Sequence, residues 1–385
     1  MLVRVLLVKN KMIVLVANTS WSVFNFRGGV IKRLLNSGCF LTIIAPADEF
    51  SDKLRAMGCN VIDLQMSAKG TNPIQDLKLM YTLYGLYQRL APDFIIHYTI
   101  KPNIYGSLAA KLAGVPSLAI TTGLGYTFVN SNLVAKVARG LYKLAFRYPK
   151  EVWFLNEDDR QEFLQHRLVP DYKAMLLHGE GVDLKHFAPQ FIGRVETEIN
   201  IAKPIRFLLI ARMLWDKGVG EYVAAAKLIK QRYPQTIFQL LGACGVANPS
   251  MITREQIRSW EEDGLVTYLG TTDDVRPFVA DADCIVLPSY REGIPRTMIE
   301  SASMGKPLIV TDVPGCRDVV IPDQTGLLCP VKDAGALAHC CETIINMDAE
   351  QITKMGLAGR ALIASKFDEE IVITQYMKTL NRYLS

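Results

Sequence analysis

Short apolar runs rich in β-branched residues alternate with helical stretches along most of the chain, the pattern of parallel α/β sheets. In the first half, the runs predict strands at residues 12–17, 40–45, 60–64, 94–98, 117–121 and 151–155. The alternation lapses across residues 189–204 and resumes with RFLLIA, TIFQLLG, LVTYLG, DCIVLP and PLIVTD. We therefore expect two doubly wound, Rossmann-like domains facing each other across a cleft, with ligands at the carboxyl ends of the strands.

The interruption of the strand–helix alternation at residues 189–204 sets the expected domain boundaries. The first domain is expected at residues 1–190 and the second at residues 200–367. A chain of 385 residues exceeds what one hydrophobic core usually serves. Half of the residues are hydrophobic and only 21% are charged, which excludes a disordered chain. Each domain can therefore bury a sizeable core.

The apolar run nearest to the length of a membrane span, residues 1–17, is interrupted by Arg4, Lys9, Asn10 and Lys11. It also lacks the longer apolar stretch and the small-residue cleavage site of a secretory signal. The eight cysteines are scattered without a CxxC or a zinc-ligand spacing. We therefore expect reduced thiols and a cytoplasmic protein.

The most informative segment is residues 288–320, where Glu292 follows a buried apolar run and Glu300 comes eight residues later. Pro295 suits the first turn of a helix that contains Glu300. Free amides at that helix start would hold an anion, and the flanking carboxylates could accept hydrogen bonds from polyol hydroxyls. An anion that carries sugars suggests a nucleotide sugar. The alternative, two ordinary solvated glutamates, leaves the recurring glycines and prolines unexplained.

The E-x7-E pair, followed by MGKPLIVTDVPG and TGLLCPVKD, resembles the retaining glycosyltransferases of family 4, which have the GT-B fold. The resemblance spans nearly the whole chain and implies an acceptor-binding first domain and a donor-binding second domain. It implies that Glu292 contacts the donor sugar and Glu300 the ribose hydroxyls, and that the helix at about residues 368–385 packs back on the first domain. The other donor-binding candidates in the second domain are Gly242, Gly293, Ile294, Pro295, Arg296 and Thr297.

Arg212 and Lys217 follow the strand RFLLIA in ARMLWDKG, which places two cations at the mouth of the second sheet. Cations in loops are usually solvated, but these two come directly ahead of the glutamate segment. In the family that the chain resembles, this R-x4-KG pattern binds the donor diphosphate. The resemblance therefore implies that both cations stabilise the departing nucleotide.

Gly28 and Gly29 occur in a segment that we expect to be a loop leading from the first strand into a helix. Their spacing is not the GxGxxG fingerprint, which disfavours hydride chemistry. A glycine pair at a helix start can present amides to a donor phosphate. A flexible turn is an equally good interpretation.

His97 ends DFIIHY at the carboxyl edge of a predicted strand, with Lys101 close behind it. A lone histidine is more often structural than catalytic, so both roles stay open. Members of the family tend to carry a histidine after the next strand, but here Gly123 and Gly125 stand at that place. The segment GLGY resembles a bacterial subgroup that adds N-acetylated sugars to polyprenyl-diphosphate carriers. Lys101 and Tyr126 are thus acceptor candidates, although GLGY can also be a tight turn.

Acidic pairs must be considered as metal sites, because many glycosyltransferases hold a divalent cation with DxD. Asp281 and Asp283 spell DAD, but we expect them to make capping bonds between a helix and a strand. Asp273 and Asp274 are predicted to cap a helix, and residues 157–159 to open another. We expect no metal and no other cofactor besides the nucleotide-sugar co-substrate.

Residues 130–150 contain five cations and no acid, and the cations fall within about 80° of arc on a helix: Lys136, Arg139, Lys143, Arg147 and Lys150. The opposite side is expected to pack on its own sheet and consists of Val134, Val137, Leu141, Leu144 and Ala145. The basic ridge could face the anionic inner surface of the cell membrane or simply be solvated. Nucleic acid is disfavoured, because the net charge is only +5 and no aromatic residues punctuate the ridge.

The resemblance implies a retaining transfer of a sugar from a nucleoside diphosphate to a lipid-linked or polysaccharide acceptor, such as a capsule or O-antigen precursor. UDP-N-acetylhexosamine is the expected donor through the GLGY subgroup alone. The protein is then expected to be peripheral at the inner face of the membrane. Two alternatives stay open: a nucleotide-sugar epimerase of GT-B fold, and a non-catalytic sugar-nucleotide-binding partner in an assembly complex.

Overall fold

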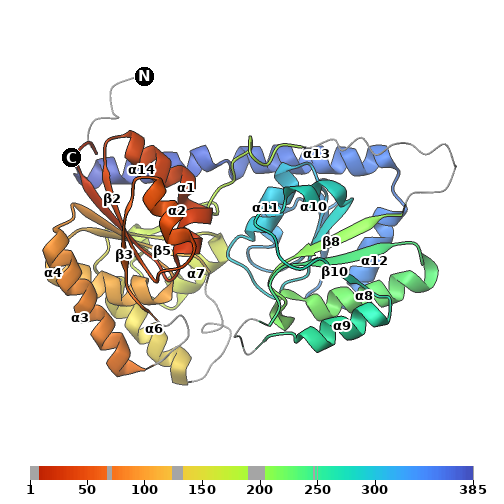
Figure 1. Cartoon of the computed structure of the whole chain (residues 1–385), viewed down its shortest axis with the longest axis horizontal. Coiled ribbons are helices and arrows are strands. Elements are labelled where there is room, and N and C mark those ends of the chain that lie inside the picture. The colour runs from red at the N-terminus through yellow and green to blue at the C-terminus, as the bar shows by residue number, and fades with distance from the viewer. Residues whose placement is uncertain are drawn as a thin grey trace. The chain divides into compact units, whose positions relative to one another are not determined.

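The protein is divided into two units, seen here in a computed structural model that describes residues 8–66, 72–123, 133–189, 204–245, 248 and 250–384 (Figure 1). Unit 1 comprises Met1–Gly181 and Glu369–Ser385, and unit 2 comprises Val182–Asp368. Residues 182–190 thus belong to unit 2, whereas the sequence-based boundary put them in the first domain. Among the helices of the described residues, none is long and apolar enough to cross a bilayer.

Unit 1 contains a seven-stranded parallel sheet in the order β3-β2-β1-β4-β5-β6-β7. The strands are β1 (Met12–Val16), β2 (Phe40–Ala45), β3 (Asn60–Asp63), β4 (Phe94–Tyr98), β5 (Ser117–Thr121), β6 (Glu151–Phe154) and β7 (Ala174–Leu176). The first six confirm the predicted strands to within one residue. The seventh was not predicted, because a three-residue edge strand with one buried side chain gives little apolar pattern.

Helices cover both faces of this sheet, as buried parallel strands require. They are α1 (Ser20–Asn36), α2 (Phe50–Ala56), α3 (Pro73–Leu90), α4 (Ser107–Ala113), α6 (Leu133–Ala145), α7 (Glu157–Gln165) and α14 (Glu369–Leu384), with a π-helical turn at Pro102–Gly106. Helices α3 and α4 share a core with Val14 and Val16 of β1. A second core joins α6 and α7 to β6.

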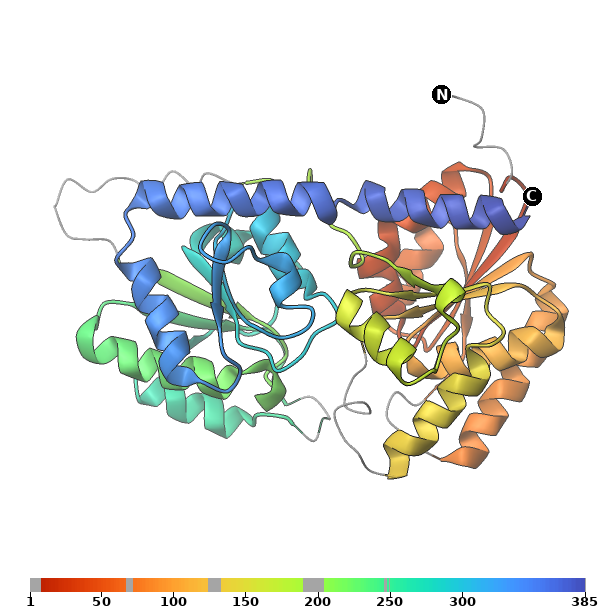
Figure 2. The ribbon, with the colours of Figure 1, turned by 180° about the vertical axis from the view of Figure 1, so that it is seen from behind.

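Gly28 and Gly29 lie inside α1, so their predicted placement in a loop at a helix start is wrong. The helix begins at Ser20 because Thr19, in extended conformation, accepts the N–H of Ser22 at 3.1 Å. The glycine pair suggested a turn, but its amides belong to the helical ladder. A Cβ on Gly29 would lie 2.5 Å from the Glu369 carboxylate of α14, which runs beside α1 (Figures 1 and 2). Gly29 therefore permits this close helix packing.

Helix α14 is joined to the sheet of unit 1 by buried polar groups. The hydroxyl groups of Tyr376 and Tyr98 lie 3.1 Å apart, both fully enclosed. The buried Glu151 carboxylate of β6 accepts hydrogen bonds from Thr379 and from Arg382, at 3.2 and 2.7 Å. These contacts satisfy a carboxylate that would otherwise be costly to bury.

Unit 2 contains a six-stranded parallel sheet in the order β10-β9-β8-β11-β12-β13. The strands are β8 (Arg206–Ile210), β9 (Ile237–Leu241), β10 (Thr267–Tyr268), β11 (Cys284–Leu287), β12 (Leu308–Thr311) and β13 (Gly326–Cys329). The first five confirm the predicted runs, and β13 was not predicted. The strand order reverses between β8 and β11, and ligands of such sheets bind at this switch point.

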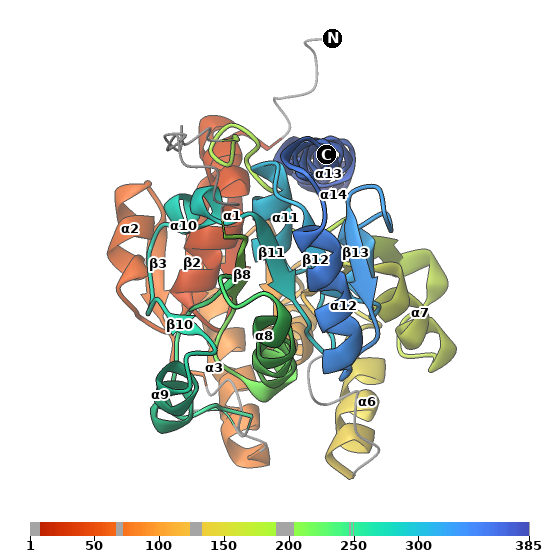
Figure 3. The same ribbon diagram turned by 90° about the vertical axis from the view of Figure 1, so that its right-hand side faces the viewer.

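The helices of unit 2 are α8 (Val219–Arg232), α9 (Arg254–Glu262), α10 (Arg276–Asp281), α11 (Arg296–Ser303), α12 (Ala334–Ile345) and α13 (Ala349–Lys366). Figure 3 shows α8 and α12 side by side against the sheet. One core lies under this pair and another under α11 and α13. All eight cysteines are free, and seven of them are buried.

The packing of α13 generates a stability prediction. A Cβ on Gly356 of α13 would overlap the backbone carbonyl oxygen of Gly305, which follows α11. Because a backbone cannot easily move away, Gly356→Ala should lower the free energy of unfolding by about 2 kcal/mol or more. Gly85→Ala in α3 is the control, since its Cβ would meet open space. Urea unfolding should show that variant to be more stable by about 0.5–1 kcal/mol, and equal destabilisation of both would contradict the packing argument.

Candidate functional site

The candidate site lies at the carboxyl ends of β8 and β11. Lys217, in the loop after β8, places its Nζ atom 2.5 Å from Oε1 of Glu292, in the loop after β11. The two side chains are only 18% and 15% exposed. The cation and carboxylate predicted from separate motifs therefore form one half-buried ion pair at the switch point of the sheet.

Two glycines allow the loops to meet. Gly218 has φ +72°, and a Cβ there would overlap the carbonyl oxygen of Pro288, directly after β11. The Tyr290 amide also donates to the Asp216 carbonyl at 2.9 Å, which ties the two loops by their backbones. On the other side, a Cβ on Gly315 (φ +80°) would lie 2.5 Å from the carbonyl oxygen of Glu292. The Lys217–Glu292 pair is thus held by backbone geometry.

Helix α11 starts beside this pair. Its N-cap, Pro295, has no side chain that can cap the first amides, and its carbonyl accepts the N–H of Met298 at 3.0 Å. The Thr297 hydroxyl donates to the carbonyl of Ile210, the last residue of β8, at 3.3 Å. The positive end of the helix therefore lies against the end of β8, where an anion would be stabilised.

Glu300 is held within the same helix. Oε1 of Glu300 accepts a hydrogen bond from Nε of Arg296 at 2.7 Å, and the Glu300 side chain is only 12% exposed. Burial raises the pKa of Glu300, and the Arg296 guanidinium lowers it and so opposes this shift. Both glutamates of the E-x7-E segment are therefore paired with a cation.

Arg212 and Gly242 stand at the same edge of the sheet. Arg212 comes two residues after β8 with an exposed side chain, and it forms no hydrogen bond or ion pair with the part of the chain that the structure describes. Gly242 follows the neighbouring strand β9 with φ +139°, and a Cβ there would overlap the carbonyl oxygen of Ala211. Gly242 therefore permits the chain after β9 to lie against the backbone of Ala211. The guanidinium of the next residue, Arg212, is available to a ligand.

Three residues near the ion pair were not foreseen from the sequence. Tyr290 donates its hydroxyl to Glu221 of α8 at 2.7 Å, and burial, with Glu221 second, raises the pKa of Tyr290. Cys316 is fully buried, and its pKa is raised by burial first and by the Glu292 charge second. Their partners lie far away in the sequence, so no local spacing could have indicated these contacts.

In unit 1, the structure gives His97 a packed environment. The ring is completely buried, its Nε2 atom lies 3.0 Å from the Tyr87 hydroxyl, and a Cβ on Gly106 would overlap the ring within 2.5 Å. Burial lowers the pKa of His97 to about 3, so the ring is neutral. This environment favours a structural role. A catalytic role stays a prediction that the geometry does not support.

The acceptor candidates are only partly described. Lys101 forms an ion pair with Asp76 of α3 at 2.7 Å, and Asp76 also accepts the Tyr105 hydroxyl at 2.9 Å. Lys101 is therefore held near the carboxyl end of β4. Tyr126 and Gly125 lie outside the described residues.

The acidic pairs have other partners. Asp281 pairs with the Arg206 guanidinium at 3.0 Å, and Asp283 accepts the Arg206 amide at 2.8 Å, so they fix the start of β8 instead of capping a helix. Asp274 accepts both the amide and the guanidinium of Arg276 in α10. Within the described ranges, no group of three or more His, Cys, Asp or Glu residues could hold a metal ion. Arg206 begins β8, at the edge of the sheet opposite to the Lys217–Glu292 pair.

The basic ridge differs in part from its prediction. Helix α6 ends at Ala145, so Arg147 and Lys150 lie beyond it. Val137 and Leu144, expected to pack on the sheet, are 56% and 42% exposed. The buried side is formed by Ala135, Tyr142, Ala145 and Phe146. Lys136, Lys143 and Arg147 are exposed and Arg139 is half-buried. The expected underside was right for Ala145 and Leu141, which pack in or against the core. It was wrong for Val137 and Leu144, because helical spacing alone does not tell which apolar stripe meets the sheet.

Comparisons with known proteins decide the family. A family model described as "Glycosyl transferases group 1" matches residues 204–347, and one described as "Glycosyl transferase 4-like" matches residues 12–156. N,N'-diacetylbacillosaminyl-diphospho-undecaprenol alpha-1,3-N-acetylgalactosaminyltransferase of Campylobacter jejuni is 32% identical over 94% of this chain and 96% of its own length. The chain belongs to glycosyltransferase family 4. The resemblance inferred from the E-x7-E segment is thereby confirmed.

Further relatives agree with this assignment. This glycosyltransferase is 27% identical to UDP-Gal:alpha-D-GlcNAc-diphosphoundecaprenol alpha-1,3-galactosyltransferase of Escherichia coli over 68% of either chain. Among solved structures, the Anabaena protein HepE in complex with UDP-glucose matches with a TM-score of 0.79 at 18% identity, over 97% of this chain and 100% of that one. Sucrose-phosphate synthase from Thermosynechococcus elongatus matches with a TM-score of 0.79 at 20% identity, over 97% and 99%. The expected GT-B fold is confirmed.

The Arg296–Glu300 pair of this glycosyltransferase generates a pH prediction. Arg296→Ala leaves a buried carboxylate without its cation and should lower the free energy of unfolding at neutral pH by about 1–2 kcal/mol. Because burial already raises the pKa of Glu300, the folded variant binds a proton more tightly than the unfolded chain does. The destabilisation is therefore absent at acidic pH and grows as the pH rises through the folded pKa.

Urea unfolding at a series of pH values measures this effect. Glu300→Gln added to Arg296→Ala should remove the pH dependence, since no carboxylate is left to titrate at this position. A destabilisation that is equal at all pH values would show that Arg296 acts by packing alone.

Proposed function

We propose that this glycosyltransferase transfers N-acetylhexosamine from a UDP-sugar to a hydroxyl of a polyprenyl-diphosphate-linked or polysaccharide acceptor, with retention of anomeric configuration. The observation that carries the proposal is the Lys217–Glu292 pair beside the start of α11, at the switch point of unit 2. The relative of C. jejuni is named for an undecaprenyl-diphosphate-linked acceptor and N-acetylgalactosamine, which supports the choice of substrates.

The donor diphosphate takes over the cation from Glu292. Lys217 and Arg212 bind the phosphate oxygens together with the first amides of α11, near Thr297. Glu292, released from Lys217, accepts hydrogen bonds from the sugar hydroxyls. Glu300, which is paired with Arg296, accepts hydrogen bonds from the ribose hydroxyls. Gly293, Ile294 and Pro295 form the backbone between the two carboxylates.

The transfer needs no protein nucleophile. The bond between the anomeric carbon and the diphosphate oxygen breaks, and the acceptor oxygen bonds to the same carbon on the same face. The acceptor proton passes to the departing diphosphate oxygen, while Lys217, Arg212 and the α11 amides stabilise the charge that grows there. We expect the reaction to proceed without a metal ion.

Unit 1 carries the acceptor in this proposal. Lys101 and Tyr126 are its candidate contacts, and the exposed cations Lys136, Lys143 and Arg147 face an anionic membrane surface. The glycosyltransferase would then work at the inner face of the cell membrane, where a lipid-linked acceptor is presented. Gly28 and Gly29 have no part in donor binding, because their amides are inside α1.

A panel of nucleotide sugars, incubated with the purified protein, tests the proposal. Nucleotide should be released only when a lipid-linked acceptor is added, and UDP-N-acetylhexosamine should be the best donor. Conversion of the donor without any acceptor would instead indicate an epimerase. Donor binding without turnover would indicate a non-catalytic partner.

Substitution of Lys217 gives the most direct test of the proposed donor site. Lys217→Ala removes a preorganised cation from the departing diphosphate and should lower kcat about a hundredfold, on the order of 3 kcal/mol of transition-state stabilisation. Lys227→Ala is the matched control, because Lys227 is an exposed lysine of α8 in the same unit and should retain full turnover. Steady-state kinetics of both variants measures this loss of turnover, and thermal unfolding checks that both variants are folded. Wild-type turnover of Lys217→Ala would refute the assignment of Lys217 to the departing diphosphate.

A further inference from the structure

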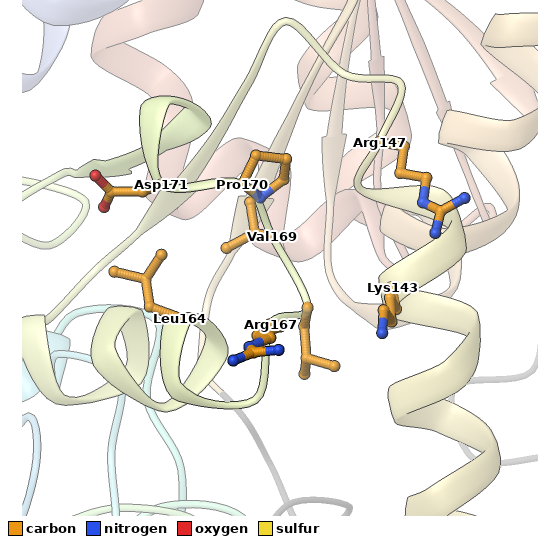
Figure 4. A pocket seen from close by; sticks show the side chains of 8 residues that line it. Lys143, Arg147, Leu164, Arg167, Val169, Pro170 and Asp171 are labelled. Carbon is orange, nitrogen blue, oxygen red and sulfur yellow. The ribbon is translucent and has the colours of Figure 1, made fainter.

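A pocket of about 570 Å³ lies in unit 1 between the end of α6 and the segment that follows α7. Lys143 and Arg147 contribute from the α6 side and Arg167 from the α7 side (Figure 4). The apolar wall between them is formed by Leu164, Leu168, Val169 and Pro170. Three cations over an apolar wall are suited to an anionic group that carries hydrocarbon.

The three cations are not neutralised internally. Within the described part of the chain, Lys143, Arg147 and Arg167 form no ion pair. The one acid that lines the pocket, Asp171, lies 3.3 Å from the Arg160 guanidinium, and its carboxylate points away from Lys143 and Arg147 in Figure 4. A net positive pocket is therefore open to an outside anion.

The backbone at Arg167 is a second and independent observation. Arg167 comes two residues after α7 with φ +51°, and the next amide, of Leu168, donates to the Phe163 carbonyl at 2.9 Å. This left-handed position after a helix usually carries glycine, because a side chain is strained there. An arginine at such a position places a long cationic side chain at the pocket at the expense of local strain.

The spacing of the cations is fixed by the core beneath them. Tyr142 and Phe146 of the α6 side pack against Phe163 of α7, with ring centroids 5.2 and 5.7 Å apart. Lys173 donates to the carbonyl groups of Arg147 and Pro149, at 2.6 and 2.8 Å, which fixes the chain just after α6. The pocket is thus largely preformed.

The surface next to the pocket is apolar. Val137 and Leu144 of α6 are 56% and 42% exposed, and Tyr148, which comes after the helix, is 38% exposed. We call these three residues the apolar stripe. We infer that this pocket, which we call the α6–α7 pocket, binds the phosphate group of an anionic membrane phospholipid while the apolar stripe meets its hydrocarbon. The inference rests on the membrane contact in the proposed function and assigns it to one site.

Sedimentation of the full-length protein with lipid vesicles tests the inference. Wild-type protein should bind phosphatidylcholine vesicles that contain one quarter phosphatidylglycerol, and vesicles of phosphatidylcholine alone only weakly. Arg167→Gly combined with Lys143→Gln should weaken this binding about tenfold or more. Because glycine suits φ +51°, the variant should fold normally, which thermal unfolding verifies.

The control variant is Lys354→Gln with Lys366→Gln, which removes two exposed charges from α13. It should bind the vesicles as wild type does. Undiminished binding by the pocket variant, or an equal loss in the control, would overturn the inference. Release of the protein from vesicles by inorganic phosphate at the same ionic strength would also overturn it, by showing a site for free phosphate.

The affinity for UDP, measured by calorimetry, separates this inference from the proposed function. It should be the same in the wild type, the pocket variant and the control. Failure of the wild type to bind UDP would refute the proposed function. The vesicle experiment would still show whether the α6–α7 pocket binds anionic phospholipid.

Discussion

The ion pair between Lys217 and Glu292 is the interaction on which the candidate site of this glycosyltransferase depends. It joins the two strands at which the sheet of unit 2 reverses its order, and it forms only because Gly218 lets one loop touch the other. A half-buried cation without a partner would be destabilising. In the proposed function, the carboxylate keeps the cation in place until a donor diphosphate replaces it.

The same principle applies one turn further along α11. Glu300 lies deep enough for burial to raise its pKa, and the charge of Arg296 opposes that shift. Both carboxylates of the site thus lie against a cation of the same unit. In the proposed function, loss of the Lys217–Glu292 pair opposes donor binding, so a ligand must supply a negative charge of its own. A neutral sugar supplies none, and the proposed site would therefore select the nucleotide-linked form.

The sequence predicted the parts of the fold that local patterns encode. Strands buried on both faces are continuous apolar runs, so eleven of the thirteen strands in the described segments were found. Gly28 and Gly29 suggested a loop, because glycine usually interrupts helices. The neighbouring α14 explains Gly29, whose Cβ would meet the Glu369 side chain, whereas a Cβ on Gly28 would meet nothing within 4 Å. The exposed stripe at Val137 and Leu144 was assigned to the core, since periodicity does not tell which way a helix faces the sheet.

The site was foreseen to the extent that its residues share local motifs. Lys217 and Glu292 each follow a predicted strand, and parallel topology places such residues at one edge. Glu300 lies inside the helix that was predicted to start at this edge. The contact between Tyr290 and Glu221, sixty-nine residues apart, has no local pattern that could indicate it. Neither has the contact of Asp281 and Asp283 with Arg206, which turns a possible DxD motif into a structural link.

The two units share one strand order, β3-β2-β1-β4-β5-β6 in unit 1 and β10-β9-β8-β11-β12-β13 in unit 2, but their helix starts differ. In unit 1, the Thr19 hydroxyl and the Asp48 carboxylate accept the first amides of α1, the latter from Trp21 at 2.8 Å. In unit 2, Gly218 and Pro295 begin α8 and α11 without any side-chain cap. Among these three helices, an anion would meet satisfied amides at the start of α1 and unsatisfied ones at the starts of α8 and α11. This difference in capping, between two sheets of the same strand order, supports the proposed placement of the nucleotide in unit 2.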